Sequence, residues 1–591
     1  MFNKFKHPCT YLLILILGTL LVIGVSIVTK SNDNTNVLSV SDTTNAYGCG
    51  TMDNNSDSTI NLGDFAVFVK VYGSQCSLSA KPTTIPSCGY IDGNENGKVD
   101  LPDFALFSQL YLNSNCTTSG ESFGGSTGGS NGGSQTQPEV QYNNAWYVSK
   151  NGNNGDGTSW TNAWNELNQI DWNSVEPGDV VYIDGGTTSC AYPTLVTGIT
   201  AQPKTSQNGS CGMQYTTTLN PAKNGTSTDP ITIKLSTESG RDGTAVVFGG
   251  RNTPLPYCSQ SGYSDSVQNR TAFDLQSQSY IVVDGSKWSG IKLYGWLFGV
   301  ELNSSANNLT FKHLEIFDNG NPIPDQKGVE LSGTNITFER SIIHDNGQDA
   351  FQSGGGISNF TLKQSWLFNQ RRSDISATDV FNGCRHSDGI QVYSGGSQYG
   401  LLVEDSIIGP GFLQGLILGD YTSSGAQYIN YGDVHDVTIR NSLLISYDGP
   451  NFNANLYTKY DSGVAYPNNP PTNYEFDHVT TYVNPGRDNW NIYLLGSGHN
   501  IHDSIFYGGG ARQLTFGSNP TFSNNVRYNV QDYGGVTTNS DPNFVDSSYW
   551  DAPEDYADFD FTSQTYSSTD KGTCVVSPAV LFSLDPGQHC P

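Results

Sequence analysis

Short segments that alternate apolar and polar residues recur through the second half of the chain. Each opens on Asn, Asp or Gly, and they begin at Asn308 (NLTFKHLEIFDNG), Asn335 (NITFERSIIHDNG), Asn359 (NFTLKQSWLFNQ), Gly400 (GLLVEDSIIG), Asp436 (DVTIRNSLLIS), Asn473 (NYEFDHVTTYV) and Asn500 (NIHDSIFYGG). Alternation with a period of two residues is typical of β-strands, and the Asn, Asp and Gly residues between segments are typical of turns. A unit this short cannot bury its own apolar face, so the segments are predicted to stack as coils of a repeat protein.

A second, shorter strand-like segment recurs between these units. It reads KGVELSG from Lys327, DAFQSGG from Asp349, DGIQVYSGG from Asp388 and QGLILGD from Gln414. If these segments stack, Asp349 lies beside Asp388 and Gln352 beside Gln391, because neighbouring strands are about 4.7–4.9 Å apart. The two carboxylates are then predicted to share one exposed face. Close carboxylates repel, so one pKa rises and the other falls, which suits an acid/base pair or a metal ligand set.

The longest interruption of the repeat falls between the same two coils and carries basic residues. It reads NQRRSDISATDVFNGCRHSDGIQ and brings Arg371, Arg372, Arg385 and His386 toward the predicted carboxylate pair. Loops over a rigid scaffold often carry function. The alternative interpretation is a structural Asp/Gln ladder with an ordinary surface loop, because such ladders are common in stacked strands.

Near the N-terminus, one unit is written twice, as CGTMDNNSDSTINLGDFAVFVKVYGSQC and CGYIDGNENGKVDLPDFALFSQLYLNSNC. Each copy has the spacing of a 12-residue calcium loop, followed by helical apolar spacing. The predicted ligands are Asp53, Asn55, Asp57, Thr59, Asn61 and Asp64 in the first loop, and Asp92, Asn94, Asn96, Lys98, Asp100 and Asp103 in the second. Lys98 stands at the position that offers only a backbone carbonyl. The alternative is an Asp/Asn-rich turn without metal.

These paired loops resemble dockerin type I modules over residues 47–116. The resemblance implies Ca²⁺ as cofactor and a cohesin-like protein as partner, as in cellulosome-like assemblies. Residues 117–141 (TTSGESFGGSTGGSNGGSQTQPEVQ) are predicted to form a flexible Gly/Ser linker.

The strand repeat resembles the right-handed parallel β-helix proteins of the pectin-lyase-like superfamily over about residues 142–591. The opening YVSKNGNNGDGTSW and the closing SDPNFVD and SPAV are similar to the ends of that family's domains. The resemblance implies an all-β, right-handed parallel β-helix that handles carbohydrate. A β-sandwich array or a propeller is the alternative fold, although no WD or kelch blade pattern appears. The family's fold also hosts lyases, hydrolases, epimerases and non-catalytic tailspikes, so fold alone does not specify an activity.

Two reactions fit the candidate residues. In β-elimination on a uronic acid, His386 or Lys327 is the base, while calcium or Arg371, Arg372 or Arg385 neutralises the carboxylate. In hydrolysis, Asp349 and Asp388 act as acid and base. We predict that the substrate contacts Gln352, Gln391 and Gln414. A non-catalytic glycan-binding or adhesive surface protein is the rival hypothesis, and His499 and His502 are interpreted as ordinary turn residues.

Composition and the N-terminus indicate an exported protein. The chain has 591 residues, only 14% of them charged, and a formal net charge of −27. This balance argues against nucleic acid as a partner and against long-range attraction of anionic glycans. Lys4 and Lys6 precede the apolar run 11–28 (YLLILILGTLLVIGVSIV), so residues 1–30 are predicted to be a signal peptide or a signal anchor that leaves the rest outside the cell. Ten cysteines follow this run, and an even set in an exported chain predicts disulfides.

Overall fold

The computed structural model describes residues 47–48, 76–77, 141–190, 211–250, 271–319, 327–347, 349–353, 356–368, 388–392, 398–412, 414–418, 434–446, 454–458, 471–483, 490–508, 514–530, 538–546, 559–568 and 570–584. The chain divides into two units, Met1–Pro138 and Glu139–Pro591. In the first unit, β1 (Tyr47–Gly48) pairs in parallel with β2 (Cys76–Ser77). The predicted export segment, calcium ligands and Gly/Ser linker, apart from its last residue, lie outside the described residues.

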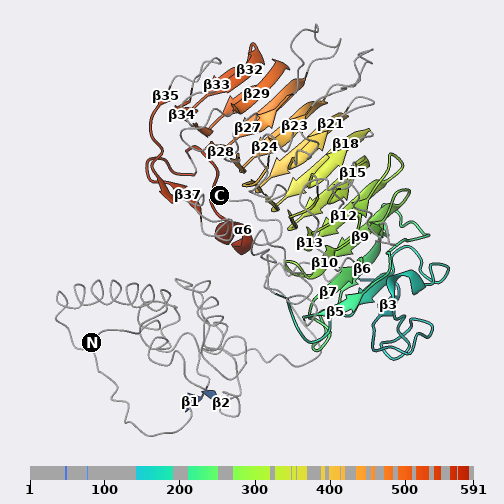
Figure 1. Cartoon of the computed structure of the whole chain (residues 1–591). Helices are drawn as coiled ribbons and strands as arrows, with labels where there is room; N and C mark the ends of the chain where they lie inside the picture. The colour runs from blue at the N-terminus through green and yellow to red at the C-terminus, as the bar shows by residue number, and fades with distance from the viewer. Residues whose placement is uncertain are drawn as a thin grey trace, which may run out of the picture. The chain divides into compact units, whose positions relative to one another are not determined.

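The second unit is a stack of coils whose strands form three rows, which we call rows A, B and C (Figure 1). Row A contains β8 (Thr271–Asp274), β11 (Phe298–Glu301), β14 (Val329–Glu330), β17 (Phe351–Ser353), β20 (Ile390–Val392), β23 (Gln414–Leu418), β26 (Ala454–Tyr457), β29 (Trp490–Ser497) and β32 (Leu514–Ser518). Row B contains β3 (Ala145–Val148), β4 (Val180–Ile183), β6 (Ile231–Leu235), β9 (Ser279–Asp284), β12 (Asn307–Lys312), β15 (Gly333–Glu339), β18 (Ile357–Lys363), β21 (Gln398–Glu404), β24 (Val434–Arg440), β27 (Thr472–Asp477), β30 (Asn500–His502) and β33 (Thr521–Ser523). Row C contains β5 (Met213–Tyr215), β7 (Ala245–Phe248), β10 (Ile291–Tyr294), β13 (Leu314–Phe317), β16 (Ile342–His344), β19 (Trp366–Phe368), β22 (Ile407–Ile408), β25 (Leu443–Ile445), β28 (Thr480–Tyr482), β31 (Ile505–Tyr507), β34 (Val526–Tyr528) and β35 (Thr538–Asn539).

Every strand in these rows pairs in parallel with its counterpart in the next coil. Rows A and B form a 21-stranded sheet, and row C forms a 12-stranded sheet. The predicted all-β, right-handed parallel β-helix is therefore confirmed. The strands β36 (Phe544–Asp546) and β37 (Asp560–Ser563) lie outside the stack as an antiparallel pair. Helix in the described residues is limited to η2 (Leu167–Gln169) and α6 (Pro578–Ser583), and neither is long or apolar enough to cross a membrane.

The core is a set of apolar columns that run through the stack. In row B, for example, Leu309, Ile336, Phe360, Leu401 and Val437 pair in register from coil to coil, and all are 5% exposed or less. The alternation in the sequence places these residues inward, and each coil covers the apolar face of the next. This arrangement satisfies the requirement that a short repeat bury its apolar residues against its neighbours.

A recurring Asn near the start of successive row B strands has a positive φ. Asn308, Asn335 and Asn359 have φ values of 51°, 55° and 54°. The amide of Asn335 donates to Asn308 Oδ1 at 3.0 Å, and that of Asn359 donates to Asn335 Oδ1 at 2.9 Å. Gly400 continues the column, because a Cβ there would lie 2.4 Å from Asn359 Oδ1. The sequence repeats Asn, Asp and Gly here because these residues tolerate the left-handed conformation.

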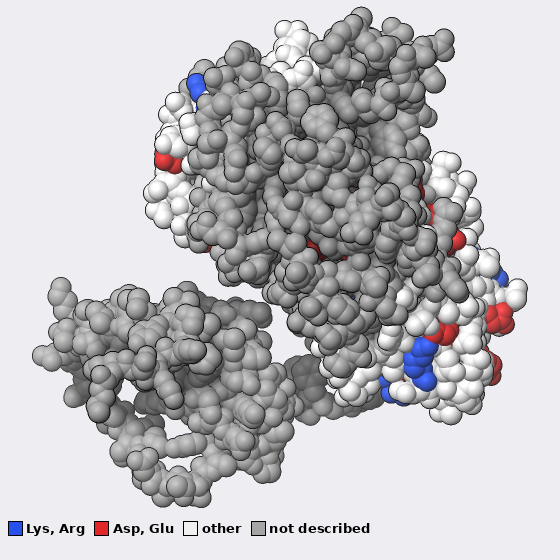
Figure 2. Space-filling model, in the orientation of Figure 1, with Lys and Arg blue, Asp and Glu red and all other residues white. Residues whose placement is uncertain are grey.

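Residues of alternating charge lie at or near the C-terminal ends of the row B strands, and we call them the charge ladder. In order, it consists of Lys234, Asp284, Lys312, Glu339, Lys363, Glu404, Arg440, Asp477 and His502, each in register with the next. Lys312 contacts Glu339 at 2.8 Å, and Glu404 contacts both Lys363 at 3.2 Å and Arg440. Basic and acidic side chains also lie close together on the visible surface in Figure 2. Opposite charges stabilise neighbouring strands, whereas like charges directly opposite one another destabilise them.

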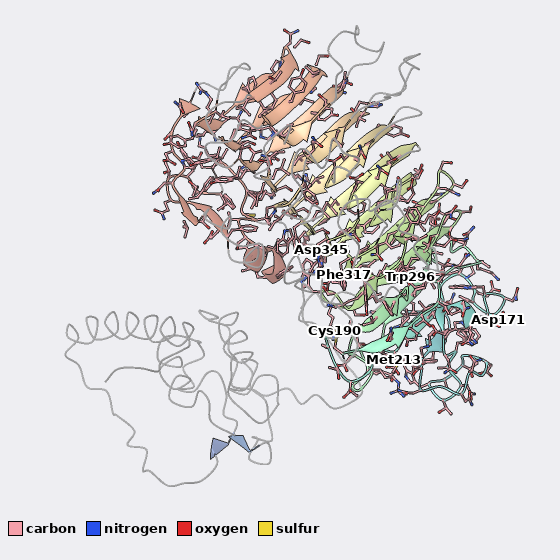
Figure 3. All side chains as sticks on the ribbon, viewed as in Figure 1. Asp171, Cys190, Met213, Trp296, Phe317 and Asp345 are labelled. Carbon is pink, nitrogen blue, oxygen red and sulfur yellow. A yellow bond between two sulfur atoms is a disulfide. The ribbon has the colours of Figure 1, made fainter. Side chains whose placement is uncertain are left out.

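An aromatic column follows row C and includes one histidine. Phe248, Tyr294, Phe317, His344 and Phe368 stack in order, with ring centroids 4.7–5.2 Å apart (Figure 3). The C-terminal residues Phe559, Phe561, Val575 and Leu581 pack against other row C residues in a second apolar cluster. The C-terminal segment therefore covers part of the outer face of row C.

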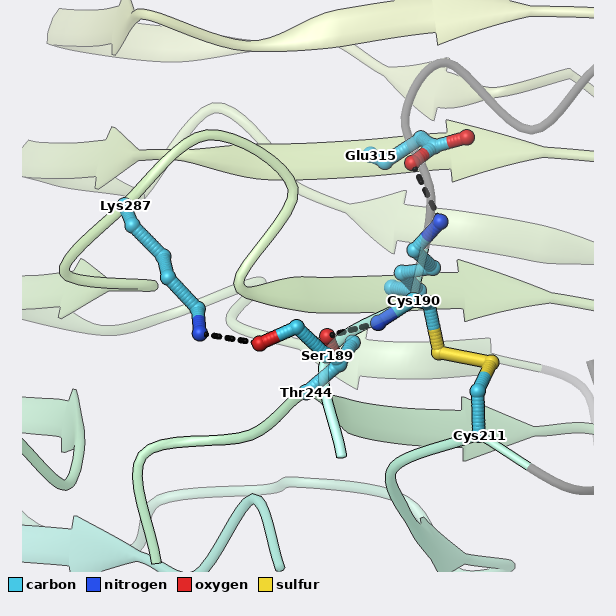
Figure 4. Close-up of a disulfide and its surroundings, with 7 residues drawn as sticks. Ser189, Cys190, Cys211, Thr244, Lys287 and Glu315 are labelled. Atoms are coloured by element: carbon cyan, nitrogen blue, oxygen red, sulfur yellow. Dashed lines mark hydrogen bonds and ion pairs between the residues drawn. A yellow bond between two sulfur atoms is a disulfide. The ribbon is translucent and has the colours of Figure 1, made fainter. Parts of the chain in front are cut away.

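A disulfide covers the first coils of row C. Cys190 and Cys211 are bonded (Figure 4), as the exported-chain interpretation predicts. They pack with Phe248, Tyr294 and Phe317. The Cys190 N–H donates to Thr244 Oγ1 at 2.9 Å. Cys574 is also disulfide-bonded.

A buried ion network lies next to the aromatic column. Lys292 Nζ is 2.8 Å from Glu315 Oε2, and both side chains are fully buried. His344 contacts Glu315 Oε1 through Nε2 at 3.1 Å and Asp345 Oδ2 through Nδ1 at 2.7 Å. Burial acts to raise the pKa of Glu315, but Lys292 and His344 outweigh it and hold this pKa far below its usual range. Burial acts to lower the pKa of His344, but Asp345 and Glu315 outweigh it and raise this pKa.

We expect Glu404→Lys to destabilise the stack more than Glu404→Gln. The lysine variant places three cations in register on adjacent strands, and breaking a buried ion pair costs about 3–5 kcal/mol. Thermal and urea unfolding followed by circular dichroism measure the difference. Equal losses in the two variants would show that like charge in register adds no destabilisation beyond the loss of the ion pairs.

Candidate functional site

A line of polar side chains, which we call the polar row, lies on the outward face of row A. It consists of Asp274, Glu301, Glu330, Gln352 and Gln391, each in register with the next. Val300, Val329 and Phe351, which precede Glu301, Glu330 and Gln352, lie in the apolar core. Successive side chains of a strand point to opposite faces, so the polar row faces outward. Three carboxylates thus stand side by side on successive coils, in contrast to the alternating signs of the charge ladder.

A cavity of about 270 Å³ opens at the first two carboxylates of the polar row. It is lined by Thr218, Thr271, Asp274, Gln276 and Glu301. Thr271 Oγ1 donates to Glu301 Oε2 at 2.6 Å, and Thr218 Oγ1 donates to the carbonyl of Thr271 at 2.7 Å. Glu301 is therefore held in place, whereas Asp274 is partly exposed. The cavity combines two carboxyl groups, two hydroxyls and an amide on a rigid sheet.

Three residues predicted from the sequence meet at the middle of the polar row. Lys327 enters it from the chain before β14 and contacts Glu330 Oε2 at 2.7 Å. Its ammonium also donates to Gln352 Oε1, and Gln352 Nε2 donates to Gln391 Oε1 at 2.5 Å. Lys327, Gln352 and Gln391 thus form a continuous hydrogen-bonded series with Glu330.

The prediction that Asp349 and Asp388 form an exposed pair of carboxylates is wrong. Their backbones do stack, but both side chains are fully buried. Asp349 Oδ1 accepts the N–H of Asp388 at 2.7 Å, and Asp388 Oδ1 accepts the N–H of Gln414 at 3.0 Å. Gln414 is itself 8% exposed. Asp349 and Asp388 lie just before the row A strands β17 and β20. There each carboxylate accepts a backbone N–H of the following coil.

The remaining predicted site residues, Arg371, Arg372, Arg385 and His386, lie outside the described residues, as do the twelve calcium ligands. Sequence reasoning missed Asp274, Glu301 and Glu330. A signal for them exists in TAFD, FGVE and KGVE, where three short apolar segments end on an acid. Two of these segments precede the first clear repeat unit, which is why their register was not recognised.

His499 is a buried structural residue between β29 and β30, whereas the interpretation of His502 as a turn residue is wrong, because His502 ends the strand β30. His499 is 1% exposed, its Nδ1 accepts the Tyr474 N–H at 3.3 Å, and its Nε2 donates to the Leu495 carbonyl at 3.0 Å. Burial lowers its pKa to about 4. Among the described residues, side chains arranged to hold a metal ion are found at Asp477, His478 and Asp503, far along row B from the polar row.

A family model matches part of this sequence, and several solved structures resemble the chain at low identity. Residues 223–408 match the sequence model of a family described as "Right handed beta helix region". A crystal structure of pectate lyase Pel9A is 16% identical, with a TM-score of 0.39, and the alignment covers 76% of this chain and 91% of that chain. A rhamnogalacturonan lyase is 14% identical, with a TM-score of 0.39, over 65% of this chain and 87% of that chain. A polygalacturonase from Erwinia carotovora ssp. carotovora is 12% identical, with a TM-score of 0.28, over 69% of this chain and 98% of that chain.

The class that the fold defines is thus the right-handed parallel β-helix. No curated protein matches this sequence. The identities and TM-scores of the similar structures do not specify an activity.

We expect Asp349→Ala to lower the thermal stability of the protein. The buried N–H of Asp388 loses its acceptor, which costs about 1–3 kcal/mol. Asp349→Asn keeps an acceptor oxygen and is expected to lose less. Gln391→Ala, on the outward face, serves as the control with a small change in Tm. An unchanged Tm in Asp349→Ala would contradict the structural role.

Proposed function

We propose that this protein is an extracellular, carbohydrate-active β-helix protein that binds a polysaccharide along the polar row and cleaves it at the cavity beside Asp274 and Glu301. One observation carries the proposal. Carboxylates of like charge stand directly opposite one another on adjacent strands, an arrangement that destabilises a sheet. In the described coils of row B the charge ladder alternates in sign instead, and a cavity opens at the first two carboxylates of the polar row. Sites that break a stabilising pattern are candidates for function.

The shape of the site favours a polymer over a small molecule. The polar row places one hydrogen-bonding group on each coil, about 4.8 Å apart, in a line that extends away from the cavity. Carboxylates accept hydrogen bonds from hydroxyls, and the amides of Gln352 and Gln391 both donate and accept them. A chain of sugars presents such groups at regular intervals.

Hydrolysis is the reaction that the cavity supports best. It needs two carboxyl groups flanking the scissile bond, about 5–5.5 Å apart for retention and about 6.5–9.5 Å apart for inversion. Asp274 and Glu301 are on adjacent strands, and the latter is oriented by Thr271. We assign these two carboxyl groups as the acid/base pair.

β-Elimination is the second candidate reaction, and Lys327 favours it. Its ammonium contacts Glu330 and Gln352 in the polar row, and its side chain is 3% exposed, so a uronate ring would have to displace one of these contacts to reach it. In this reaction Lys327 removes the C5 proton and the product is unsaturated. A non-catalytic glycan-binding or adhesive role is the rival proposal, in which the polar row binds sugar without cleaving it.

The N-terminal part of the chain completes the proposal. Residues 47–116 are proposed to bind Ca²⁺ through their two loops and to dock a cohesin-like protein, while residues 1–30 direct export or anchor the chain at the cell surface. The spacing of oxygen ligands in both loops supports the calcium assignment. No nucleic-acid partner is proposed.

The full chain tested against neutral and uronate polysaccharides, with and without Ca²⁺, separates these reactions. We expect new reducing ends without ultraviolet-absorbing product, and a loss of about 10²–10⁴-fold in kcat for Glu301→Gln. Glu176→Gln, at an exposed acid away from the cavity, is the matched control. Unsaturated product, lost in Lys327→Gln, would instead assign a lyase. Binding without cleavage would overturn the enzymatic proposal in favour of adhesion.

Calcium binding has its own test. Isothermal titration of the full chain with CaCl₂ is expected to show two loop sites, and the double variant Asp64→Ala/Asp103→Ala is expected to weaken both at least about tenfold, because each carboxylate closes its loop. Asp156→Asn, outside the loops, is the control. Unchanged calcium affinity in the double variant would contradict the proposed loops.

A further inference from the structure

The C-terminal end of the charge ladder differs in chemistry from the rest. Earlier coils pair an acid with Lys or Arg, but here His502 takes the place of the cation opposite Asp477. The turn residues that follow are His478 and Asp503, with φ values of 52° and 51°. Two successive turns therefore read Asp-His and His-Asp. Acids and imidazoles alternate both along the chain and between coils.

These side chains converge on one point. Ligand atoms of Asp477, His478 and Asp503 all lie within 4.8 Å of one another. His478 Nδ1 is 2.6 Å from Asp477 Oδ1, while His502 Nδ1 is 2.9 Å from Asp503 Oδ2 and 3.4 Å from Asp477 Oδ1. The four side chains are 21–32% exposed, so an ion from solution can reach them.

The surroundings hold the cluster in place. Asn524 Nδ2 donates to Asp503 Oδ1 at 2.7 Å, and the Gly572 N–H donates to the Asp503 carbonyl at 2.7 Å. Glu475 Oε1 is 3.5 Å from His502 Nε2 and adds a further acid. The nearby cation, Lys571, contacts Asn524 and lies 3.6 Å from Asp570. Groups that orient ligands in this way raise the metal affinity of a site.

Other acid–imidazole contacts in the described coils lack this convergence. His435 pairs with Asp436 at 2.7 Å, and His313 pairs with Asp284 at 2.7 Å, each as one imidazole with one carboxylate. Neither belongs to a group of three converging ligands in the part of the chain that the structure describes. A histidine beside an acid is therefore common in this fold, whereas the crossed double pair is particular to the Asp477–Asp503 region.

We infer that Asp477, His478 and Asp503 form a binding site for a divalent transition-metal ion of the Zn²⁺ type. Imidazole nitrogen combined with carboxylate oxygen suits Zn²⁺, whereas Ca²⁺ takes oxygen ligands. Solvent or His502 completes the coordination. The ion joins the turns of two successive coils and stabilises the folded state, because the unfolded chain does not bring these residues together. The site is independent of the proposed polysaccharide cavity.

Titration of the untagged full chain with ZnCl₂ tests this site, with Ca²⁺ present to fill the N-terminal loops. Compared with the wild type, His478→Ala is expected to lose one zinc equivalent or to bind it at least about tenfold more weakly. His435→Ala, which removes a single acid–imidazole pair, is the matched control and is expected to bind like the wild type. Zinc is also expected to raise the Tm of the wild type and of the control, but not that of His478→Ala.

Melting in EDTA establishes that each variant is folded. If His478→Ala does not fold, His478→Gln replaces it, because an amide fills the turn but is a poor zinc ligand. Equal zinc stoichiometry and affinity in the wild type and the folded His478 variant would overturn the inference, as would a Tm that zinc leaves unchanged.

Discussion

The structure depends on the register with which each coil stacks on the next. Within the stack, each coil contacts mainly its two neighbours, and the C-terminal segment adds further contacts with row C. A shift of one residue would turn the apolar columns outward and the charges inward. Several independent columns oppose such a shift. The apolar columns require burial, the Asn column requires positive φ, and the charge ladder requires alternating sign along row B.

The same register creates the candidate site. Because the inward residues of row A are fixed by the core, their outward neighbours on successive strands are aligned without any further device. A column that is neutral or alternating in charge stabilises the stack. The column at Asp274, Glu301 and Glu330 is neither, because three acids are in register there. Lys327 contacts Glu330, which places an ammonium in the middle of the row.

The sequence was sufficient to predict the fold and the stacking of Gln352 on Gln391, because period-two alternation and turn residues are local signals. It was not sufficient to predict burial. Asp349 and Asp388 resemble catalytic acids in the sequence, but the strand position decides whether a carboxylate faces solvent or the backbone of the next coil, and they bind the backbone. Glu301 is the opposite case, because the sequence did not identify it and the structure places it at the cavity. Its segment, FGVE, is too short for periodicity to assign, and its cavity forms only when Thr218 and Gln276 from other parts of the chain come beside it.

Departures from the repeating pattern have two different physical meanings in this protein. Lys292, Glu315 and His344 are charged or polar residues in a largely apolar interior, but their side chains contact one another. We therefore interpret the network as a structural part of row C. Asp274 and Glu330 of the polar row and the Asp477–His502 turns depart from charge alternation at partly exposed positions, whereas Glu301 is only 6% exposed. A buried polar group must find its partners within the protein, whereas an accessible one can find them in a ligand. Accessibility therefore distinguishes the buried network, whose polar groups contact one another, from the cavity and the proposed metal site, which partly exposed residues line.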